Sequence, residues 1–163
     1  MRTSFAIALG SNMRHPHHGA PAHVLRAALN ALDAGPVQVL CASPILASRP
    51  IGPSHRLYAN GAALIETDLD PEALLDHLKQ LERRFGRKMG GQPWRARPLD
   101  LDILLWSDGA FVSSRLCIPH KELANRPFVL APLVQIAPRW RHPIMHLCIA
   151  HLKARLDRKA PGA

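Results

Sequence analysis

Asp100 and Asp102 are the residues of this chain whose type and spacing could do chemistry most directly. They lie two positions apart in an apolar run that follows Arg95 and Arg97. An alternating run of this kind is typical of a β-strand, whose successive side chains point to opposite faces. Both carboxylates would then share one face, about 7 Å apart at a rise of about 3.3 Å per residue. Four apolar residues of the run would pack on the other face: Leu99, Leu101, Ile103 and Leu105.

Two carboxylates on one strand face, with Arg97 nearby, suit magnesium carrying a polyphosphate, because Mg²⁺ prefers hard oxygen ligands. The alternative is a strand end whose carboxylates cap a neighbouring turn, and the pair alone does not decide between the two. The chain contains no Gly-x-x-x-x-Gly-Lys-Ser/Thr sequence, which excludes a Walker-type phosphate loop. Any ATP would therefore be held by metal ions and arginines.

The composition is typical of one globular domain. The chain has 163 residues, of which 47% are hydrophobic, enough for one sizeable core and short for two. We therefore expect a single domain over residues 1–163. The formal net charge of +9 favours an anionic partner, such as a nucleotide, RNA or an acidic membrane. Because there is no run of about 18 apolar residues and the N-terminus is unlike a secretory signal, we expect a cytoplasmic protein.

Cysteine and histidine spacing gives little support for disulfides or a zinc site. The cysteines are odd in number and widely spaced, which favours buried free thiols. Histidines cluster near both ends of the chain, but neither cluster has the Cys/His spacing of a closed tetrahedral zinc site. The residues concerned are Cys41, Cys117 and Cys148, then His15, His17 and His18, and finally His142, His146 and His151.

Hydrophobic periodicity predicts the elements that would position the acidic pair. Pro21 follows a loop and Gly35 closes the first predicted helix, whereas Asp70 and Pro71 supply the N-cap and first position of the second. Glycine, proline and basic residues mark residues 86–98 as a loop that leads into the acidic strand. The predicted strands are 3–9, 37–41, 58–66 and the acidic run; the predicted helices are 21–33, 71–85, 127–135 and 146–159. This alternation, with hairpin connections, indicates an α+β fold.

Several short motifs accompany the acidic pair in a fixed order along the chain. Gly10-Ser11-Asn12 and Tyr58-Ala59-Asn60-Gly61 precede it, and Ile118-Pro119-His120 and Asn125-Arg126-Pro127-Phe128 follow it. In this order and at these spacings the chain resembles the 6-hydroxymethyl-7,8-dihydropterin pyrophosphokinase family of folate biosynthesis. The resemblance covers residues 6–138, and residues 146–163 would form a C-terminal helix and a basic tail.

The resemblance implies a ferredoxin-like antiparallel sheet with helices packed on its faces. It also implies a reaction in which MgATP and 6-hydroxymethyl-7,8-dihydropterin give AMP and the pterin diphosphate. Two Mg²⁺ ions held by Asp100 and Asp102 would bridge the phosphates of ATP. The substrates would be small molecules, without nucleic acid or membrane partners, and the protein would be a monomer.

The same resemblance assigns roles to individual residues. Asp100 and Asp102 would be the metal ligands and, with Arg87 and Arg97, the catalytic residues. Asp102 could also accept the proton of the pterin hydroxyl. The ATP-binding residues would be Arg87, Trp94, Arg97, Ile103, His120 and Arg126. The pterin-binding residues would be Ser48, Pro50, Ile51, Tyr58, Asn60, Trp94, Asp100 and Phe128, with the ring sandwiched between Tyr58 and Phe128.

Two other functions remain open on the sequence alone. A small basic α+β protein could bind RNA, but Tyr58-Ala59-Asn60-Gly61 lacks the aromatic signature that RNA-binding sheets carry. A related magnesium-dependent phosphoryl or nucleotidyl transferase with another acceptor would use the same carboxylates. Packing in the core is the alternative for Phe128, because large aromatic side chains are usually buried.

Overall fold

A computed structural model describes residues 1–48, 57–86 and 98–159 of the chain. Its centre is an antiparallel sheet with the strand order β2-β4-β1-β5, and β3 also pairs with β4. The strands are β1 Thr3–Ser11, β2 Val37–Ala42, β3 Leu46–Ser48, β4 Tyr58–Thr67 and β5 Asp100–Trp106, and a separate small hairpin consists of β6 Phe111–Val112 and β7 Cys117–Ile118. The expected α+β class is confirmed.

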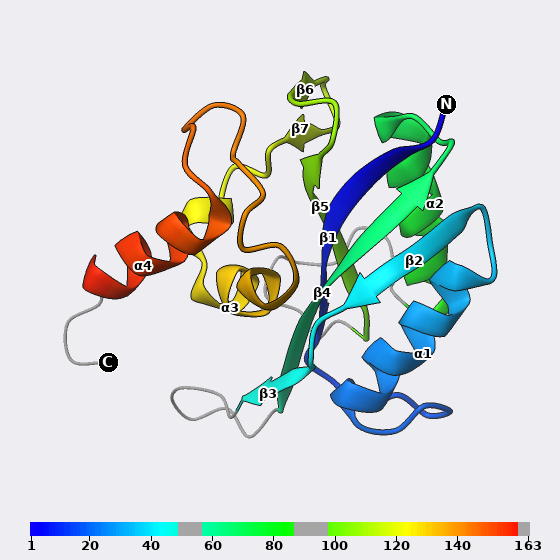
Figure 1. Ribbon diagram of the computed structural model, residues 1–163. Helices are drawn as coiled ribbons and strands as arrows, with labels where there is room; N and C mark the ends of the chain where they lie inside the picture. The colour runs from blue at the N-terminus through cyan, green and yellow to red at the C-terminus, as the bar shows by residue number, and fades with distance from the viewer. Residues whose placement is uncertain (49–56, 87–97, 160–163) are drawn as a thin grey trace.

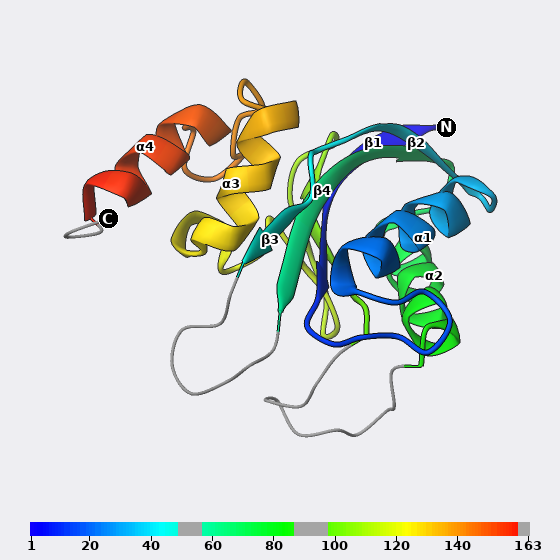
Figure 2. The same ribbon diagram turned by 90° about the horizontal axis from the view of Figure 1, so that it is seen from below.

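Helices lie on both sides of the sheet, as Figures 1 and 2 show. On one side are α1 Pro21–Asp33 and α2 Pro71–Arg84. On the other side α3 Pro127–Ile136 packs against β4 and β1, and α4 Ile149–Lys159 packs against α3. A short 3-10 helix, Leu123–Asn125, leads into α3. One face of the sheet is therefore covered by α1 and α2, and the other by α3 with α4 behind it.

Local sequence accounts for the first two helices. Both begin with proline, at the first helical position, where a backbone N–H would have no acceptor within the helix. Asp70 caps α2, since its side chain accepts a hydrogen bond of 2.8 Å from the backbone N–H of Ala73. Gly86 follows α2 with a φ of 95°, a left-handed conformation that glycine adopts without strain. The predicted limits of α1 and the N-cap of α2 are confirmed.

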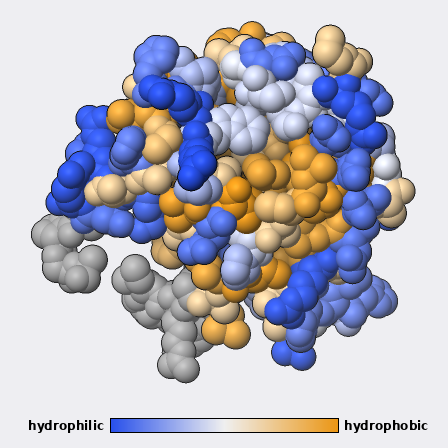
Figure 3. All heavy atoms as spheres, in the orientation of Figure 1, coloured by the Kyte–Doolittle hydropathy of each residue, from blue (hydrophilic) through white to orange (hydrophobic). Residues whose placement is uncertain are grey.

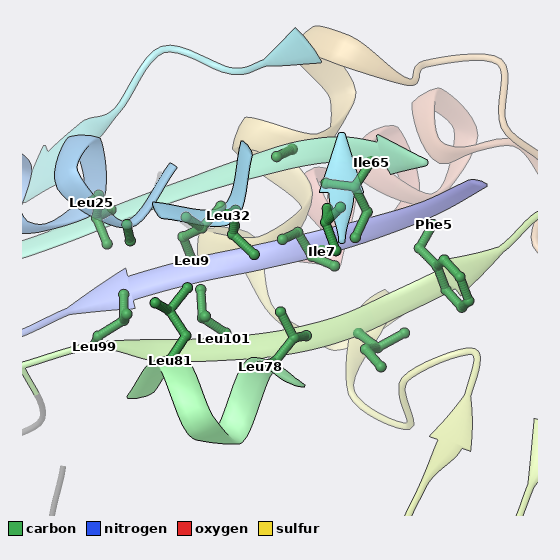
Figure 4. Close-up of a cluster of buried hydrophobic side chains, with 14 of the residues drawn as sticks. Phe5, Ile7, Leu9, Leu25, Leu32, Ile65, Leu78, Leu81, Leu99 and Leu101 are labelled. Carbon is green, nitrogen blue, oxygen red and sulfur yellow. The ribbon is translucent and has the colours of Figure 1, made fainter. Parts of the chain in front are cut away.

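The main hydrophobic core lies between the sheet and the helices α1 and α2. Alternate residues of β1 and β5 enter it, including Ile7, Leu9 and Leu101, and meet Leu25 of α1 and Leu81 of α2 (Figure 4). Phe5 stacks on Trp106 at the far end of the sheet, with ring centroids 5.9 Å apart. Because strand side chains alternate, the intervening residues of β1 and β5 face α3 instead.

A second core lies between the opposite sheet face and α3 and α4, and it corrects one prediction. Leu105 belongs to this core, together with Ala6 and Leu130, and not to the core of Leu101. The register shifts in β5, because Ile103 pairs with Ile7 while Leu105 pairs with Ala6, so Leu104 is an extra residue. Such a β-bulge reverses the alternation that follows it. The expected packing therefore holds only as far as Ile103.

Three further differences from the sequence expectations have local causes. Helix α4 begins at Ile149, because His146 has a φ of 57° and Arg141 pairs with Cys148 to close a loop before it. The strands β3, β6 and β7 have two or three residues, too few to show a period. The three thiols are free, but Cys41 is exposed on the edge strand β2 and the other two are half-buried, so the prediction of buried thiols is wrong.

The surface seen in the orientation of Figure 1 has an apolar area across its middle, with hydrophilic residues around it (Figure 3). Large apolar side chains that remain exposed include Leu40, Phe128 and Ile144. Within residues 1–48, 57–86 and 98–159, no helix has the length and apolar character needed to cross a membrane.

Candidate active site

The two carboxylates of β5 lie on the sheet face that carries α3. Asp100 pairs with Gly10 of β1, and Asp102 pairs with Ala8. Leu101, between them, points to the opposite face and is buried in the main core. The predicted arrangement of two carboxylates on one strand face is therefore present in the fold.

Two rows of residues cross the sheet at this point. One row consists of Asn60 on β4, Gly10 on β1 and Asp100 on β5; the next row consists of Ala62, Ala8 and Asp102. Small residues occupy the central strand in both rows. The sheet therefore forms a low floor, with an amide on one side and carboxylates on the other.

A cavity of about 210 Å³ lies over this floor. Five predicted site residues line it: Asn60, Asp100, Asp102, Arg126 and Phe128. Arg126 is the N-cap residue of α3 and is exposed, and Phe128 lies in the first turn of that helix with 54% of its side chain exposed. The position of Phe128 at the cavity, and not in the core, favours its binding role over simple packing.

Burial and charge act together on Asp102. The pKa of its carboxyl is raised above the usual value of 3.8, first because burial penalises the ionised form and second because the neighbouring Asp100 repels its charge. Positive charge on His120, Lys79 and Arg126 opposes this rise in the pKa. The site therefore holds an ionised Asp102 at a cost, unless a cation joins it.

Glu82 of α2 fixes the strand that carries the carboxylates. Its side chain is 1% exposed, and its Oε1 accepts a hydrogen bond of 2.8 Å from the backbone N–H of Leu101. Lys79 lies one turn away, with its Nζ 3.5 Å from Oε2 of Glu82. Among the described strands of the sheet β5 pairs with β1 alone, so this N–H has no strand partner there, and Glu82 satisfies it.

His120 is held near Asp102 through its own backbone. Its N–H donates a hydrogen bond of 3.0 Å to the carbonyl oxygen of Leu104, the bulge residue of β5. Its Nδ1 accepts a hydrogen bond of 3.1 Å from the N–H of Glu122. A neutral His120 therefore carries its proton on Nε2, which can serve as a donor.

The other predicted site residues fall into three groups. Tyr58 is half-buried, two residues before Asn60 on the same face of β4, and pairs with Ser48 at the end of β3. Ile103 has its side chain 3% exposed in the main core, so only its backbone could meet a nucleotide. Five residues lie outside the described part of the chain: Pro50, Ile51, Arg87, Trp94 and Arg97.

Sequence reasoning missed some residues of the cavity. Ala8, Leu9 and Val129 line it as well, and none was singled out beforehand. The alternation of small residues at Ala8 and Gly10 was the available signal for the floor. Val129 could not be found in this way, because only the docking of α3 brings it to the sheet.

Both histidine clusters contribute a ring that accepts hydrogen bonds within a local turn. Within the described ranges, no group of three or more histidine, cysteine or acidic side chains is placed to hold a metal ion. The Nδ1 of His15 instead accepts hydrogen bonds from the N–H groups of His17 and His18. The Nδ1 of His142 accepts hydrogen bonds from two N–H groups of its own loop. Both rings serve as caps of local turns.

Comparison with known proteins assigns this arrangement to a family. Residues 6–138 match the family model described as 7,8-dihydro-6-hydroxymethylpterin-pyrophosphokinase. A relative from Haemophilus influenzae, named 2-amino-4-hydroxy-6-hydroxymethyldihydropteridine pyrophosphokinase, is 41% identical over 133 residues, which are 80% of this chain and 79% of that protein. A relative of the same name from Pseudomonas aeruginosa is 38% identical over 139 residues, 84% of this chain and 82% of that protein.

Larger proteins contain a similar region. The folate synthesis bifunctional protein of Arabidopsis thaliana is 36% identical over 80% of this chain, which corresponds to 26% of that protein. The crystal structure of wild-type HPPK-DHPS from Plasmodium falciparum aligns with a TM-score of 0.72 and 13% identity, over 95% of this chain and 41% of that chain. The structural match supports the fold described above.

Proposed function

The chain belongs to the 7,8-dihydro-6-hydroxymethylpterin-pyrophosphokinase family, and we propose that its reaction takes place in the cavity between the sheet and α3. The protein transfers pyrophosphate from ATP to 6-hydroxymethyl-7,8-dihydropterin in folate synthesis, giving AMP and the pterin diphosphate. One observation carries the proposed location: a single cavity joins the amide of Asn60, the carboxylates of Asp100 and Asp102, and the exposed ring of Phe128.

The pterin end of the site would be the row of Asn60 and Asp100. An amide offers both a donor and an acceptor to the edge of a nitrogen heterocycle. Phe128 lies over the same cavity, and an aromatic face there would stack on a planar ring. Tyr58 would contact the opposite face of the ring, which is the sandwich that the family resemblance implies. The same resemblance adds contacts from Ser48, Pro50, Ile51 and Trp94.

The donor set fits magnesium. Asp100 and Asp102 offer hard oxygen ligands on one face, and the described residues add no third carboxylate, histidine or cysteine to close a cage. Mg²⁺ is commonly bound by one or two carboxylates, with phosphates and water at its other positions. We assign two Mg²⁺ ions to these two residues, where the ions would supply charge neutralisation and alignment for the phosphates of ATP.

Asp102 is the proposed acceptor for the proton of the pterin hydroxyl. The hydroxyl oxygen forms a bond to the β-phosphorus of ATP, the bond from that phosphorus to the oxygen of the α-phosphate breaks, and AMP leaves with that oxygen. Asp102 lines the cavity beside Asp100, where its carboxylate oxygen could accept this proton.

Cationic residues would bind the phosphate oxygens of ATP and stabilise their charge. Arg126 lines the cavity, and its guanidinium can bind phosphate oxygens in pairs. His120 would donate from Nε2 to the nucleotide. By resemblance, Arg87 and Arg97 would stabilise charge on the transferred group, and Trp94 would help to seat ATP.

The decisive experiment follows the products. Purified protein with Mg²⁺, ATP and 6-hydroxymethyl-7,8-dihydropterin should release AMP and form pterin diphosphate in equal amounts, and Asp100→Asn should abolish both. Release of ADP, or of AMP without the pterin, would contradict the proposed reaction at this site. In this proposal the protein acts as a cytoplasmic monomer on small molecules alone, and light scattering at working concentration would test the monomer.

A further inference from the structure

Gly10 occupies the centre of the site floor, between Asn60 and Asp100 in the row that crosses three strands. It lines the cavity together with both of these neighbours. In the adjacent row the central residue is Ala8, between Ala62 and Asp102. The floor is therefore one methyl group deeper beside Asp100 than beside Asp102.

The backbone itself does not require glycine at this position. The φ of Gly10 lies outside the left-handed range, so an L-residue could adopt the same conformation. A Cβ at Gly10 would lie 3.5 Å from Oδ1 of Asn60 and 4.0 Å from the carbonyl oxygen of Ala59. Both distances are ordinary van der Waals contacts. The fold would accept alanine here, which separates the role of Gly10 in the site from any role in folding.

A methyl group at Gly10 would nevertheless change what the cavity can hold. It would contact the amide oxygen of Asn60 and occupy the space directly above the central strand. Donor and acceptor of an N–H···O hydrogen bond lie about 2.7 to 3.2 Å apart, and a pair at about 3.6 Å is no longer hydrogen-bonded. A ligand lifted by one methyl group could not keep good hydrogen bonds to Asn60 and still lie against Asp100.

We propose that Gly10 is a specificity-determining residue for the pterin. Its bare Cα lets the edge of a flat nitrogen heterocycle descend between Asn60 and Asp100 and reach both at once. The substrate class that fits is a planar ring with donors and acceptors on its edge. ATP binds towards Asp102 and Arg126, where the floor already carries the methyl group of Ala8, and therefore depends little on Gly10. This inference rests on the proposed function of the cavity.

Gly61 provides a matched control on the neighbouring strand. It pairs with Leu9, and its Cβ would point away from the cavity, 3.6 Å from Oγ of Ser43 and 3.9 Å from Cγ1 of Ile45. Its φ also lies outside the left-handed range. Gly61→Ala therefore adds the same methyl group to the same sheet, with similar contacts, outside the site.

The test compares Gly10→Ala and Gly61→Ala with the wild-type protein. Gly10→Ala should raise the dissociation constant and KM of the pterin by about 10- to 100-fold, the effect of losing one or two hydrogen bonds. Its ATP dissociation constant should change by less than about threefold, and its Tm should not fall. Gly61→Ala should leave both ligands unaffected. Equal pterin affinity in all three proteins would overturn the inference, and so would a parallel loss of pterin and ATP affinity in Gly10→Ala.

A double variant distinguishes a role of Gly10 in pterin binding from a role in the fold alone. Once Gly10→Ala has lifted the pterin away from Asn60, the further change Asn60→Ala should cost clearly less affinity than it costs in the wild-type background. Strict additivity would contradict the inference. Failure of the proposed function is distinguishable, because the wild-type protein would then release no AMP with the pterin.

Discussion

Asp102→Asn should stabilise the metal-free protein while it abolishes turnover. The pKa of Asp102 is raised by burial and by Asp100. Below the usual pKa of 3.8, the carboxyl is protonated in both the folded and the unfolded chain and does not affect the balance between them. As the pH rises from 3.8 through the higher pKa of the folded protein, the unfolded chain loses its proton first and the folded state loses stability. Asparagine removes this loss.

The part of the gain that comes from repulsion between Asp100 and Asp102 follows from the geometry of the strand. Two charges about 7 Å apart, the spacing of alternate residues on a strand, repel by about 2 kcal/mol at an effective dielectric constant near 20. Asp100 and Asp102 are both partly exposed, and screening by solvent reduces the repulsion to about 1 kcal/mol. For a chain of this length, about 1 kcal/mol corresponds to a rise in Tm of about 2 to 4 °C.

Thermal unfolding in EDTA between pH 3.5 and pH 8 would measure this effect. The Tm of Asp102→Asn should exceed that of wild type at pH 8, and the difference should shrink as the pH falls towards 3.5, because the pKa of the folded carboxyl is raised above 3.8. Asp108→Asn, in the exposed turn after β5, is the matched control and should show no such trend. Added Mg²⁺ should raise the Tm of wild type more than that of Asp102→Asn. The reasoning on Asp102 is wrong if Asp102→Asn is less stable than wild type at pH 8 in EDTA. It is also wrong if the variant keeps more than about a tenth of the wild-type turnover, which is a loss below about 1.4 kcal/mol in the activation free energy.

Three further predictions concern the surroundings of the carboxylates. Asn60→Ala should weaken pterin binding by about 1 to 3 kcal/mol, because the ring edge loses its partners, and leave ATP binding unchanged in calorimetry; an equal loss for both ligands would indicate misfolding. Phe128→Ala should raise the KM of the pterin at least about tenfold, because about 1.4 kcal/mol of stacking and contact is lost. The Tm should not change, because the ring is half-exposed. A fall in Tm would instead place the ring in the core. Glu82→Ala should lower the free energy of unfolding by about 1 to 3 kcal/mol, because the buried N–H of Leu101 loses its acceptor. Glu82→Gln keeps an acceptor oxygen and should lose much less of this free energy in urea titrations. An equal effect of both variants would contradict the role of the hydrogen bond.

The elements that the sequence predicted well carry their signals locally. The helix α1 has apolar residues at helical spacing, a proline at its start and a Gly-Pro stop after it, and its observed limits match the prediction. The facing of Asp100 and Asp102 follows from strand alternation alone. In contrast, the change of face at Leu105 depends on the bulge, which only the pairing with β1 reveals.

The candidate site shows the same division. Asn60, Asp102 and Phe128 come from separate segments, and the family resemblance selected them together, but no local period could show that they share a cavity. Glu82 illustrates what physical reasoning from sequence cannot reach. A glutamate on a helix is usually exposed, and its burial makes sense only once α2 is packed beside the unpaired edge of β5.

The bulge at Leu104 has a consequence for how chain length can vary in this family. If Leu104 were deleted, Ile103 would still face Ile7 and Leu105 would still face Ala6, so neither the carboxylates nor Trp106 would turn to the wrong side. The ladder therefore does not need this residue. Two things would disappear: the side chain of Leu104, which is buried in the second core, and the carbonyl oxygen that receives the N–H of His120. A shortened strand would keep its pairing with β1 and lose the hydrogen bond that holds the histidine. We therefore expect relatives that lack the residue at the position of Leu104 to lack a histidine at the position of His120 as well.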